Sequence, residues 1–312
     1  METYPKNLEE LELNFSTEEA CRKYLAELRW PDGFKCPACG GPAAWELANG
    51  LFKCRTCSRK TSVIAGTVFE GTRKPLVTWF RMIWWVAGQK NGASALGLKR
   101  MLGLGSYETA WTWLHKLRRA MVRPGQDRLT GTVQVDETFI GGAKSGKRGR
   151  GAEGKALVLI IAQEKGKSTG RIRLRRIDDA SSESLEATIK ETVEPGTLIK
   201  TDGWKGYIGV NAIGYDHKVI RQTEDVGINL LPLCHQEASL IKRWLGGTHQ
   251  GAVSHEHLSY YLDEYTFRFN RRTSRSRRLL FFRLLQNAVV MKHTGYNEIA
   301  LSVRGRKPKH KM

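Results

Sequence analysis

The chain has 312 residues, of which 40% are hydrophobic and 26% charged, a composition typical of a globular protein with more than one domain. Its 51 Lys and Arg residues outnumber its 31 Asp and Glu residues, and the net charge of +20 indicates nucleic acid as a partner rather than a membrane surface. No run of about 18 apolar residues could span a bilayer and no signal peptide is recognisable, so we expect a protein of the reducing cytoplasm.

Residues 1–30 are expected to form an N-terminal helical segment. Residues 15–29 carry apolar side chains at helical spacing, with Ser16 or Thr17 as N-cap and glutamates in the first turn. The sequence WPDGFKC ends this helix and leads into a segment of another kind.

Two Cys-x-x-Cys motifs, separated by 14 residues, predict a zinc ribbon over residues 31–66. Each motif places two thiolates on one tight turn, so together they offer the four ligands of a tetrahedral site: Cys36, Cys39, Cys54 and Cys57. Because no coordination position stays open, we expect structural Zn²⁺ rather than a redox dithiol. The other two cysteines, Cys21 and Cys234, are interpreted as small packed hydrophobes.

Residues 67–122 are predicted to form three helices separated by glycine-containing breaks. A short helix, a turn and a helix that begins after Ser106 and ends in Lys116, Arg118 and Arg119 resemble a helix-turn-helix DNA-binding region. The alternative is a purely structural trihelix whose tryptophans form a core. A polar linker, VRPGQDRLTG, then marks a domain boundary.

From residue 126 to 290 the pattern predicts an α/β domain with a mixed sheet. Three strands within residues 132–178, a helix over 181–193, a fourth strand from 197 and a helix over 231–245 follow the order of a ribonuclease-H-like sheet. Residues 257–290 are expected to be helical, and residues 291–312 form a basic tail. The expected fold class is therefore α+β multidomain.

Two strands of this domain end in a carboxylate followed by glycine. Val133 and Val135 share one face of the first strand and Gln134 and Asp136 the other, and Asp202 follows the fourth strand. If these strands are neighbours, Asp136 and Asp202 meet at one edge, and a divalent cation would relieve their repulsion. Two such metals would activate an attacking hydroxyl and stabilise the leaving oxygen of a phosphodiester.

These motifs resemble the DDE transposases of bacterial insertion sequences, in the group with an N-terminal zinc ribbon. The resemblance lies in the four cysteines, in VDETFIGG and TDGWKGY, and most specifically in residues 240–272. It implies Mg²⁺- or Mn²⁺-dependent cleavage of DNA at the element's terminal inverted repeats and joining of 3′ hydroxyls to target DNA. The implied partner is double-stranded DNA at the bacterial nucleoid, bound by a homo-oligomer.

The third catalytic ligand departs from the family pattern, which places a glutamate seven residues before a Lys or Arg on a helix. The residue seven positions before Lys242 is His235, and Glu237 lies about 200° further round the helix, so both cannot face one metal. We favour His235 and keep Glu237 as the alternative. Lys242 is expected to touch a phosphate, although a solvated helix face is the plain alternative.

Other basic residues are candidate DNA-backbone contacts, with a solvated surface as the alternative. They are Lys144, Lys147, Arg148 and Arg150 in a glycine-rich loop, and Arg268, Arg271, Arg272 and Arg275 near a predicted helix end. Glu137 is expected to point away from Asp136, and Lys205 and Tyr207 face substrate or cap the strand.

Two further functions compete with transposition. The chain could be a catalytically inactive DNA-binding regulator, which the histidine in place of glutamate supports, or a ribonuclease-H-like nuclease without strand transfer. A regulator would bind DNA without metal-dependent cleavage. A nuclease would cleave DNA but would not join precut ends.

Overall fold

The computed structural model describes residues 4–122, 128–141, 155–222, 229–249, 253–254, 256–274, 276 and 278–301. It divides into two compact units. One comprises Met1–Arg123 together with Ser274–Met312, and the other Pro124–Thr273. In the described parts of the chain, no helix is both long and apolar enough to cross a membrane.

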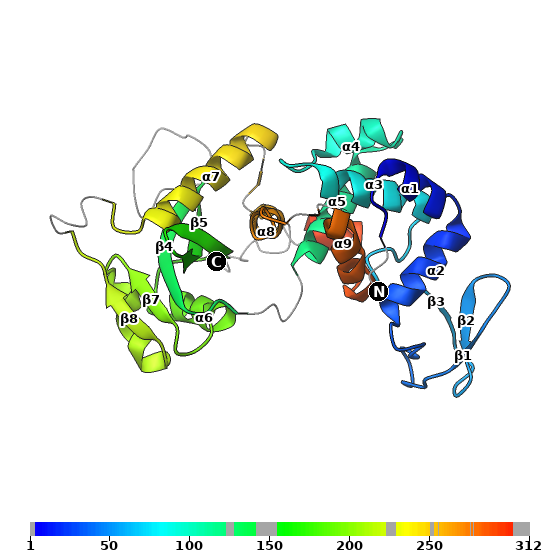
Figure 1. The fold of residues 1–312 in the computed structure, drawn as a ribbon, viewed down its shortest axis with the longest axis horizontal. Helices are drawn as coiled ribbons and strands as arrows, with labels where there is room; N and C mark the ends of the chain where they lie inside the picture. The colour runs from blue at the N-terminus through cyan, green and yellow to red at the C-terminus, as the bar shows by residue number, and fades with distance from the viewer. Residues whose placement is uncertain are drawn as a thin grey trace, which may run out of the picture. The chain divides into compact units, whose positions relative to one another are not determined.

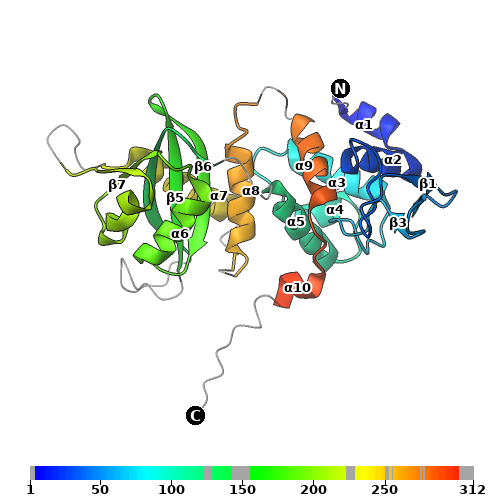
Figure 2. The same ribbon diagram turned by 90° about the horizontal axis from the view of Figure 1, so that it is seen from below.

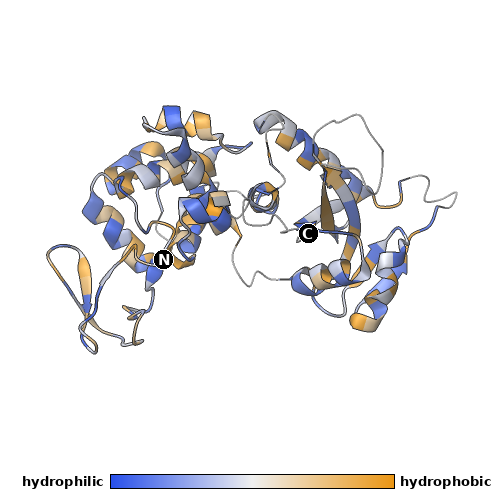
Figure 3. Ribbon diagram, turned by 180° about the vertical axis from the view of Figure 1, so that it is seen from behind, coloured by the Kyte–Doolittle hydropathy of each residue, from blue (hydrophilic) through white to orange (hydrophobic). Residues whose placement is uncertain are grey.

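The first unit contains a small sheet and a set of helices (Figure 1). Its strands form an antiparallel three-stranded sheet: β1 (Ala44–Glu46), β2 (Leu51–Cys54) and β3 (Lys60–Ser62). Its helices are α1 (Leu8–Asn14), α2 (Glu18–Arg29), α3 (Leu76–Gly88), α4 (Ala95–Met101), α5 (Tyr107–Met121), α9 (Arg278–Val290) and α10 (Tyr296–Leu301). Hydrophobic and hydrophilic stretches alternate along these helices, as expected where one face of a helix is buried (Figure 3).

The helix starts follow the capping residues that the sequence indicated. Thr17 accepts a hydrogen bond from the backbone N–H of Ala20 at the start of α2, and Ser106 accepts one from Glu108 at the start of α5. The three helices expected between residues 74 and 122 are α3, α4 and α5, and this prediction is confirmed.

The core of the first unit consists largely of aromatic rings. Trp79 and Trp113 stack with ring centroids 3.9 Å apart, and Phe80 meets Phe281 of α9 edge to face at 5.9 Å. Helix α9 therefore packs among α2, α3 and α5. We expected the α/β domain to extend to residue 290, but the division between the two units falls after residue 273. Helix α9 belongs to the first unit, because its apolar side chains are buried there.

The cationic end of α5 is buried rather than presented to solvent. Arg118 is 2% exposed and its guanidinium lies 3.4 Å from Nε2 of His115. Lys116 is 9% exposed. These two side chains are thus largely buried, and the helix-turn-helix interpretation of this region stays a prediction.

The second unit is a five-stranded mixed sheet with helices on both faces (Figures 1 and 2). Its elements are β4 (Thr132–Ile140), β5 (Ala156–Lys165), β6 (Ser168–Ile177), α6 (Ser182–Thr192), β7 (Leu198–Thr201), the 3-10 helix η1 (Lys205–Ile213), β8 (Asp216–Val219), α7 (Pro232–Thr248) and α8 (Leu258–Phe269). The strand order is β6-β5-β4-β7-β8, with β4, β7 and β8 parallel to one another and β5 antiparallel to both its neighbours. The predicted mixed sheet is confirmed. The strand β8 was not predicted, because its four residues are too few and too polar to show a clear alternation of apolar and polar side chains.

Alternation along the strands divides the second unit into two cores. Val133, Val135 and Ile161 pack on one face with α6 and η1. Ile160 and Ala162 pack on the other face with α7 and α8. Asp136 shares the face that α7 covers, so the position of α7 decides what surrounds this carboxylate.

We predict that Phe281→Ala weakens the first unit selectively. Phe281 is fully buried against Phe80 and Trp84, and removal of a buried phenyl ring costs about 3–5 kcal/mol. Hydrogen exchange should show faster exchange in α2, α3 and α5 and unchanged protection in β4–β6. Val290→Ala, at a position 62% exposed on the same helix, should change stability by less than about 0.5 kcal/mol.

Candidate metal and catalytic sites

The four cysteines of the zinc ribbon converge on one point. The Sγ atoms of Cys36 and Cys57 are 3.7 Å apart, those of Cys39 and Cys54 are 3.6 Å apart, and all four lie within 4.8 Å of one another. Zinc–sulfur bonds of about 2.3 Å require sulfur–sulfur distances of about 3.8 Å in a tetrahedron. The donor set therefore fits structural Zn²⁺.

Each ligand pair sits on a turn that the backbone closes. The N–H of Gly40 donates to the carbonyl of Cys36, and the N–H of Ser58 donates to the carbonyl of Cys54. Gly40 and Ser58 take the corresponding left-handed conformation, with φ of 73° and 58°. Backbone N–H groups of Cys57 and Thr56 lower the pKa of Cys54 to about 6, which favours the thiolate that zinc binds.

Cys21 and Cys234 lie apart from this cluster. Both are buried, with 0% and 1% of their surface exposed, and burial raises the pKa of each thiol. They are packed side chains, as expected.

Asp136 and Asp202 meet at one edge of the second sheet. Strands β4 and β7 pair in parallel with Val133 opposite Ile199 and Gln134 opposite Lys200. Continuing this register by two residues brings Asp202 level with Asp136, on the same face of the sheet. Asp136 is half-buried and Asp202 is exposed.

The electrostatics of Asp136 agree with this placement. Burial raises its pKa, and the negative charge of Asp202 raises it further, while the backbone N–H of Glu137 and the side chain of His235 lower it. Oδ1 of Asp136 accepts from the Glu137 N–H at 2.9 Å, and Oδ1 of Asp202 accepts from the Trp204 N–H at 2.9 Å. The second oxygen of Asp136 faces helix α7.

His235 completes the group from the first turn of α7. Its Nε2 lies 3.3 Å from Oδ2 of Asp136, and its Nδ1 lies 2.5 Å from Oδ1 of Asn229. Because an amide oxygen only accepts, Nδ1 carries the proton that bonds to Asn229, and Nε2 faces the carboxylate. A protonated Nε2 would donate to Oδ2 of Asp136, and a neutral one would offer a lone pair to a metal ion bound beside the carboxylate.

Glu237 points to the opposite side of α7. Its side chain is 0% exposed and accepts a hydrogen bond from the Tyr265 hydroxyl of α8 at 3.3 Å. Burial raises the pKa of Glu237 to about 7, although Tyr265 and the charge of Arg272 oppose the rise. The helix thus separates the two candidate third ligands and brings only His235 to Asp136.

Two lysines flank the carboxylate edge. Nζ of Lys242 donates to Oγ1 of Thr138 at 2.8 Å, and Thr138 lies two residues beyond Asp136 on the same strand face. Burial lowers the pKa of the Lys242 ammonium, the positive charge of Lys155 lowers it further, and the charge of Asp136 opposes this shift. Both lysines are therefore close enough to act electrostatically on this edge.

Gln134 holds α7 against the sheet, a role that its residue type alone did not indicate. Its Oε1 accepts from the backbone N–H of Leu233, in the first turn of α7, at 3.0 Å. Its Nε2 donates to Glu164 at 2.9 Å, and Glu164 also binds Lys200 of β7 through both oxygens. The network joins the strands of Asp136 and Asp202 to the helix of His235.

Tyr207 lies beneath the same edge on the opposite face of the sheet. It is 0% exposed, and burial together with the charges of Glu137 and Asp136 raises its pKa. It packs in the core with α6, so of the two expected roles its position agrees with support of the strand end and not with substrate contact. Lys205 is exposed.

The arginines of α8 have partners within the second unit. Arg268 donates twice to Glu264, whose side chain is 1% exposed, in a fork-shaped ion pair. Arg271 and Arg272 lie over aromatic rings of α8, and Arg272 also donates to carbonyls of β6. Arg268 thus neutralises a buried carboxylate, and DNA contact by Arg268, Arg271 and Arg272 stays a prediction. Lys144, Lys147, Arg148, Arg150 and Arg275 lie outside the described residues.

Among the described residues, the four cysteines are the only group of three or more potential ligands whose atoms all lie within 4.8 Å. Asp136, Asp202 and His235 do not form such a group, so their ligand atoms stand further apart than those of the four cysteines.

Comparison with known proteins gives two family matches and one relative. Residues 128–270 match the model of the ISXO2-like transposase domain, and residues 16–60 match the transposase zinc-ribbon domain. The chain is 25% identical over 280 residues to an uncharacterized protein in the transposable element ISH50 of Halobacterium salinarum, which covers 81% of this chain and 91% of that protein.

Removal of the metal should unfold the ribbon alone. Binding of zinc contributes about 10–16 kcal/mol to the folding of so small a module. A chelator should therefore open residues 31–66 to limited proteolysis while β4–β8 stay resistant, and added Zn²⁺ should restore protection. An unchanged cleavage pattern would refute a structural metal.

Glu237 should make stability depend on pH. Its folded pKa of about 7 exceeds the ordinary value of 4.5, so the folded state binds this proton more tightly than the unfolded chain. Its contribution is complete below pH 4.5 and is lost as the pH rises to about 7, by up to about 3 kcal/mol. Urea unfolding across this range should show the decline in the wild type and a smaller decline in Glu237→Gln. Equal declines in both proteins contradict the assignment.

Proposed function

With a transposase zinc ribbon ahead of an ISXO2-like transposase domain, this chain belongs to the insertion-sequence transposases, and we propose on that premise that it cleaves DNA at element ends and joins the ends to target DNA. The observation that carries the proposal is the meeting of Asp136 and Asp202 on adjacent parallel strands, with His235 3.3 Å from Asp136. The net charge of +20 suits a polyanionic substrate.

Asp136, Asp202 and His235 are the residues proposed to hold divalent cations. Mg²⁺ or Mn²⁺ bound there would supply charge for the attacking and the leaving oxygen of a phosphodiester. The raised pKa of Asp136 supports this role, since a carboxylate that is costly to ionise alone gains most from a nearby cation.

The chain's own residues orient the reaction. Asn229 holds the Nδ1 proton of His235 and directs Nε2 to the reacting edge. Thr138 holds the Lys242 ammonium beside Asp136, where it would bind a phosphate oxygen near the scissile bond. Gln134 fixes the helix that carries both side chains.

Cleavage uses water as nucleophile at the end of the element, breaks the bond between phosphorus and the 3′ oxygen, and leaves a 3′ hydroxyl. The same edge then positions this hydroxyl to attack a target phosphodiester, so that a bond forms between its oxygen and the target phosphorus while the target's own 3′ oxygen leaves as a hydroxyl. Because two ends must be held together for joining, we propose that a homo-oligomer acts on DNA at the nucleoid.

Cleavage of a duplex that carries the element's terminal inverted repeat tests the proposal. Asp136→Ala, Asp202→Ala and His235→Ala should each lower the Mn²⁺-dependent cleavage rate at least about 100-fold, because each removes a metal ligand. Glu237→Ala should retain the reaction, measured at a temperature where the variant is folded.

Two results would overturn parts of this scheme. Binding of the repeat without cleavage in any metal means that the chain is an inactive DNA-binding regulator. Cleavage without joining of precut ends means a nuclease. If Glu237→Ala, shown folded by circular dichroism, loses activity while His235→Ala keeps it, the assignment of the third ligand is wrong.

His235→Glu should change the metal preference. Imidazole is a softer donor than carboxylate and leaves the site one negative charge poorer, so the wild type should favour Mn²⁺ over Mg²⁺ more strongly than the variant does. The measurement is the ratio of cleavage rates in the two metals. Gln236→Glu adds the same charge at the adjacent exposed position, and it should leave the ratio at the wild-type value.

A further inference from the structure

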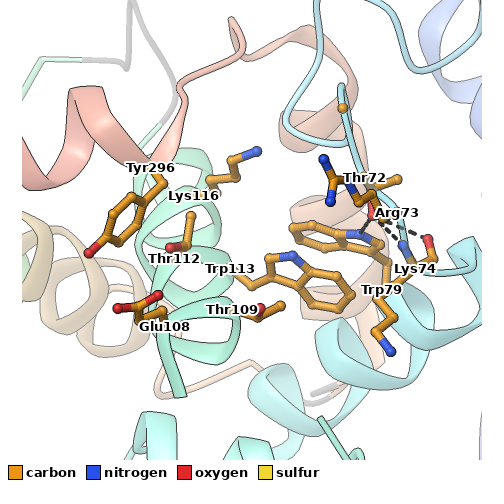
Figure 4. Close-up of a pocket in the computed structure, with 11 residues that line it drawn as sticks. Thr72, Arg73, Lys74, Trp79, Glu108, Thr109, Thr112, Trp113, Lys116 and Tyr296 are labelled. Atoms are coloured by element: carbon orange, nitrogen blue, oxygen red, sulfur yellow. Dashed lines mark hydrogen bonds between the residues drawn. The ribbon is translucent and has the colours of Figure 1, made fainter. Parts of the chain in front are cut away.

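The first unit contains a groove that the proposed chemistry does not use (Figure 4). Its volume is about 480 Å³, within the range of small-molecule sites. The loop before α3, one face of α5 and the first residue of α10 line it.

Three cationic side chains line the groove, and Figure 4 shows the Arg73 guanidinium and the Lys116 ammonium on one side of the indole rings and the Lys74 side chain on the other. Arg73 and Lys74 are exposed on the loop, and Lys116 enters from α5. Lys116 is 9% exposed, and within the described part of the chain its ammonium makes a single hydrogen bond, to the Val68 carbonyl at 3.5 Å. Burial lowers the pKa of Lys116 and the negative charge of Glu70 opposes this shift, and an anion in the groove would stabilise the charged form further.

An aromatic surface and a carboxylate stand at the other side. Tyr296 is 44% exposed, and Figure 4 shows its ring beside Glu108 and Thr112, away from Arg73. The indole of Trp113 forms the wall between the two sides, held by its stack on Trp79 at 3.9 Å.

The three features match the parts of one nucleotide. A phosphate suits the cations Arg73 and Lys116, an unpaired base suits a half-exposed tyrosine ring, and a carboxylate accepts hydrogen bonds from an exocyclic amino group. A paired base cannot enter, because its edge and both its faces are covered in a duplex.

We propose that this groove binds an unpaired nucleotide of DNA, with its phosphate against Arg73 and Lys116 and its base against Tyr296. The proposal deepens the proposed function, since it rests on DNA as the substrate. It predicts that the protein prefers DNA ends with an unpaired overhang to blunt ends.

Binding of labelled duplexes to the full-length chain carrying Asp136→Ala, without added divalent metal, tests this. The quantity measured is the ratio of affinities for a duplex with a short overhang and for the same duplex with blunt ends. Tyr296→Ala should reduce this ratio about 5- to 100-fold, the range for loss of one base stack. Arg73→Gln should also reduce it and should flatten the salt dependence of overhang binding by about one unit of slope.

Matched substitutions outside the groove serve as controls. Tyr107 is 50% exposed on α5 and Arg100 is exposed on α4, and neither lines the groove. Tyr107→Ala and Arg100→Gln should leave the ratio unchanged. A photoreactive 5-iodouracil in the overhang should crosslink to Tyr296 or Trp113.

A ratio near one in the Asp136→Ala protein overturns the proposal, and so does a ratio that Tyr296→Ala and Arg73→Gln leave intact in that background. A general loss of affinity for both duplexes in these variants means backbone contact only, and it also overturns the nucleotide pocket. The Asp136→Ala protein is expected not to cleave DNA, so this binding test does not depend on catalysis. If the protein prefers overhangs and Tyr296→Ala removes the preference, but the wild type does not cleave DNA, only the proposed function is rejected.

Discussion

The hydrogen bonds of Gln134 hold together the edge on which the proposed chemistry depends. Its amide oxygen accepts from the N-terminus of α7, where no side chain of the helix itself provides a cap. Its amide nitrogen reaches Glu164, which in turn binds Lys200 of β7. Because Gln134 is buried, loss of its side chain would leave the backbone N–H of Leu233 without its partner, whereas Glu164 would keep its bonds to Lys200. The positions of Asp136, Asp202 and His235 are thus set by one polar network in an otherwise apolar core.

The same edge concentrates charge in a way that ordinary folding disfavours. Two carboxylates on neighbouring strands repel each other, and burial raises the cost of ionising Asp136. His235 and Lys242 reduce this cost within the chain, and a divalent cation would reduce it further. Glu237 shows the contrasting case on the other side of α7. There burial raises the pKa of the Glu237 carboxyl to about 7, and its side chain accepts a hydrogen bond from Tyr265. Glu237 therefore supports packing of α7 rather than metal binding at the carboxylate edge.

The first unit solves a different problem. The ribbon of β1–β3 has few apolar side chains, mainly the cluster of Trp30, Phe34 and Phe52, and four thiolates supply the ligands that replace a core. The neighbouring helices form a core of stacked tryptophans, and even Arg118 is buried, so little of the surface of α5 is exposed to solvent. Part of the remaining surface of α5 lines the groove that also contains Tyr296. Basic residues near one another in sequence therefore do not form one surface.

The sequence by itself determined the zinc ligands, the strands that end in Asp136 and Asp202 and the helices between residues 74 and 122, because each follows from local spacing. Periodicity also placed His235 and Glu237 on different faces of α7. Only the tertiary structure decided which face meets Asp136, since that depends on Gln134 anchoring the helix. It also moved α9 into the first unit and paired Arg268 with Glu264. Partners distant in sequence, such as Phe80 for Phe281, leave no local pattern, so packing and buried charge had to be seen in three dimensions.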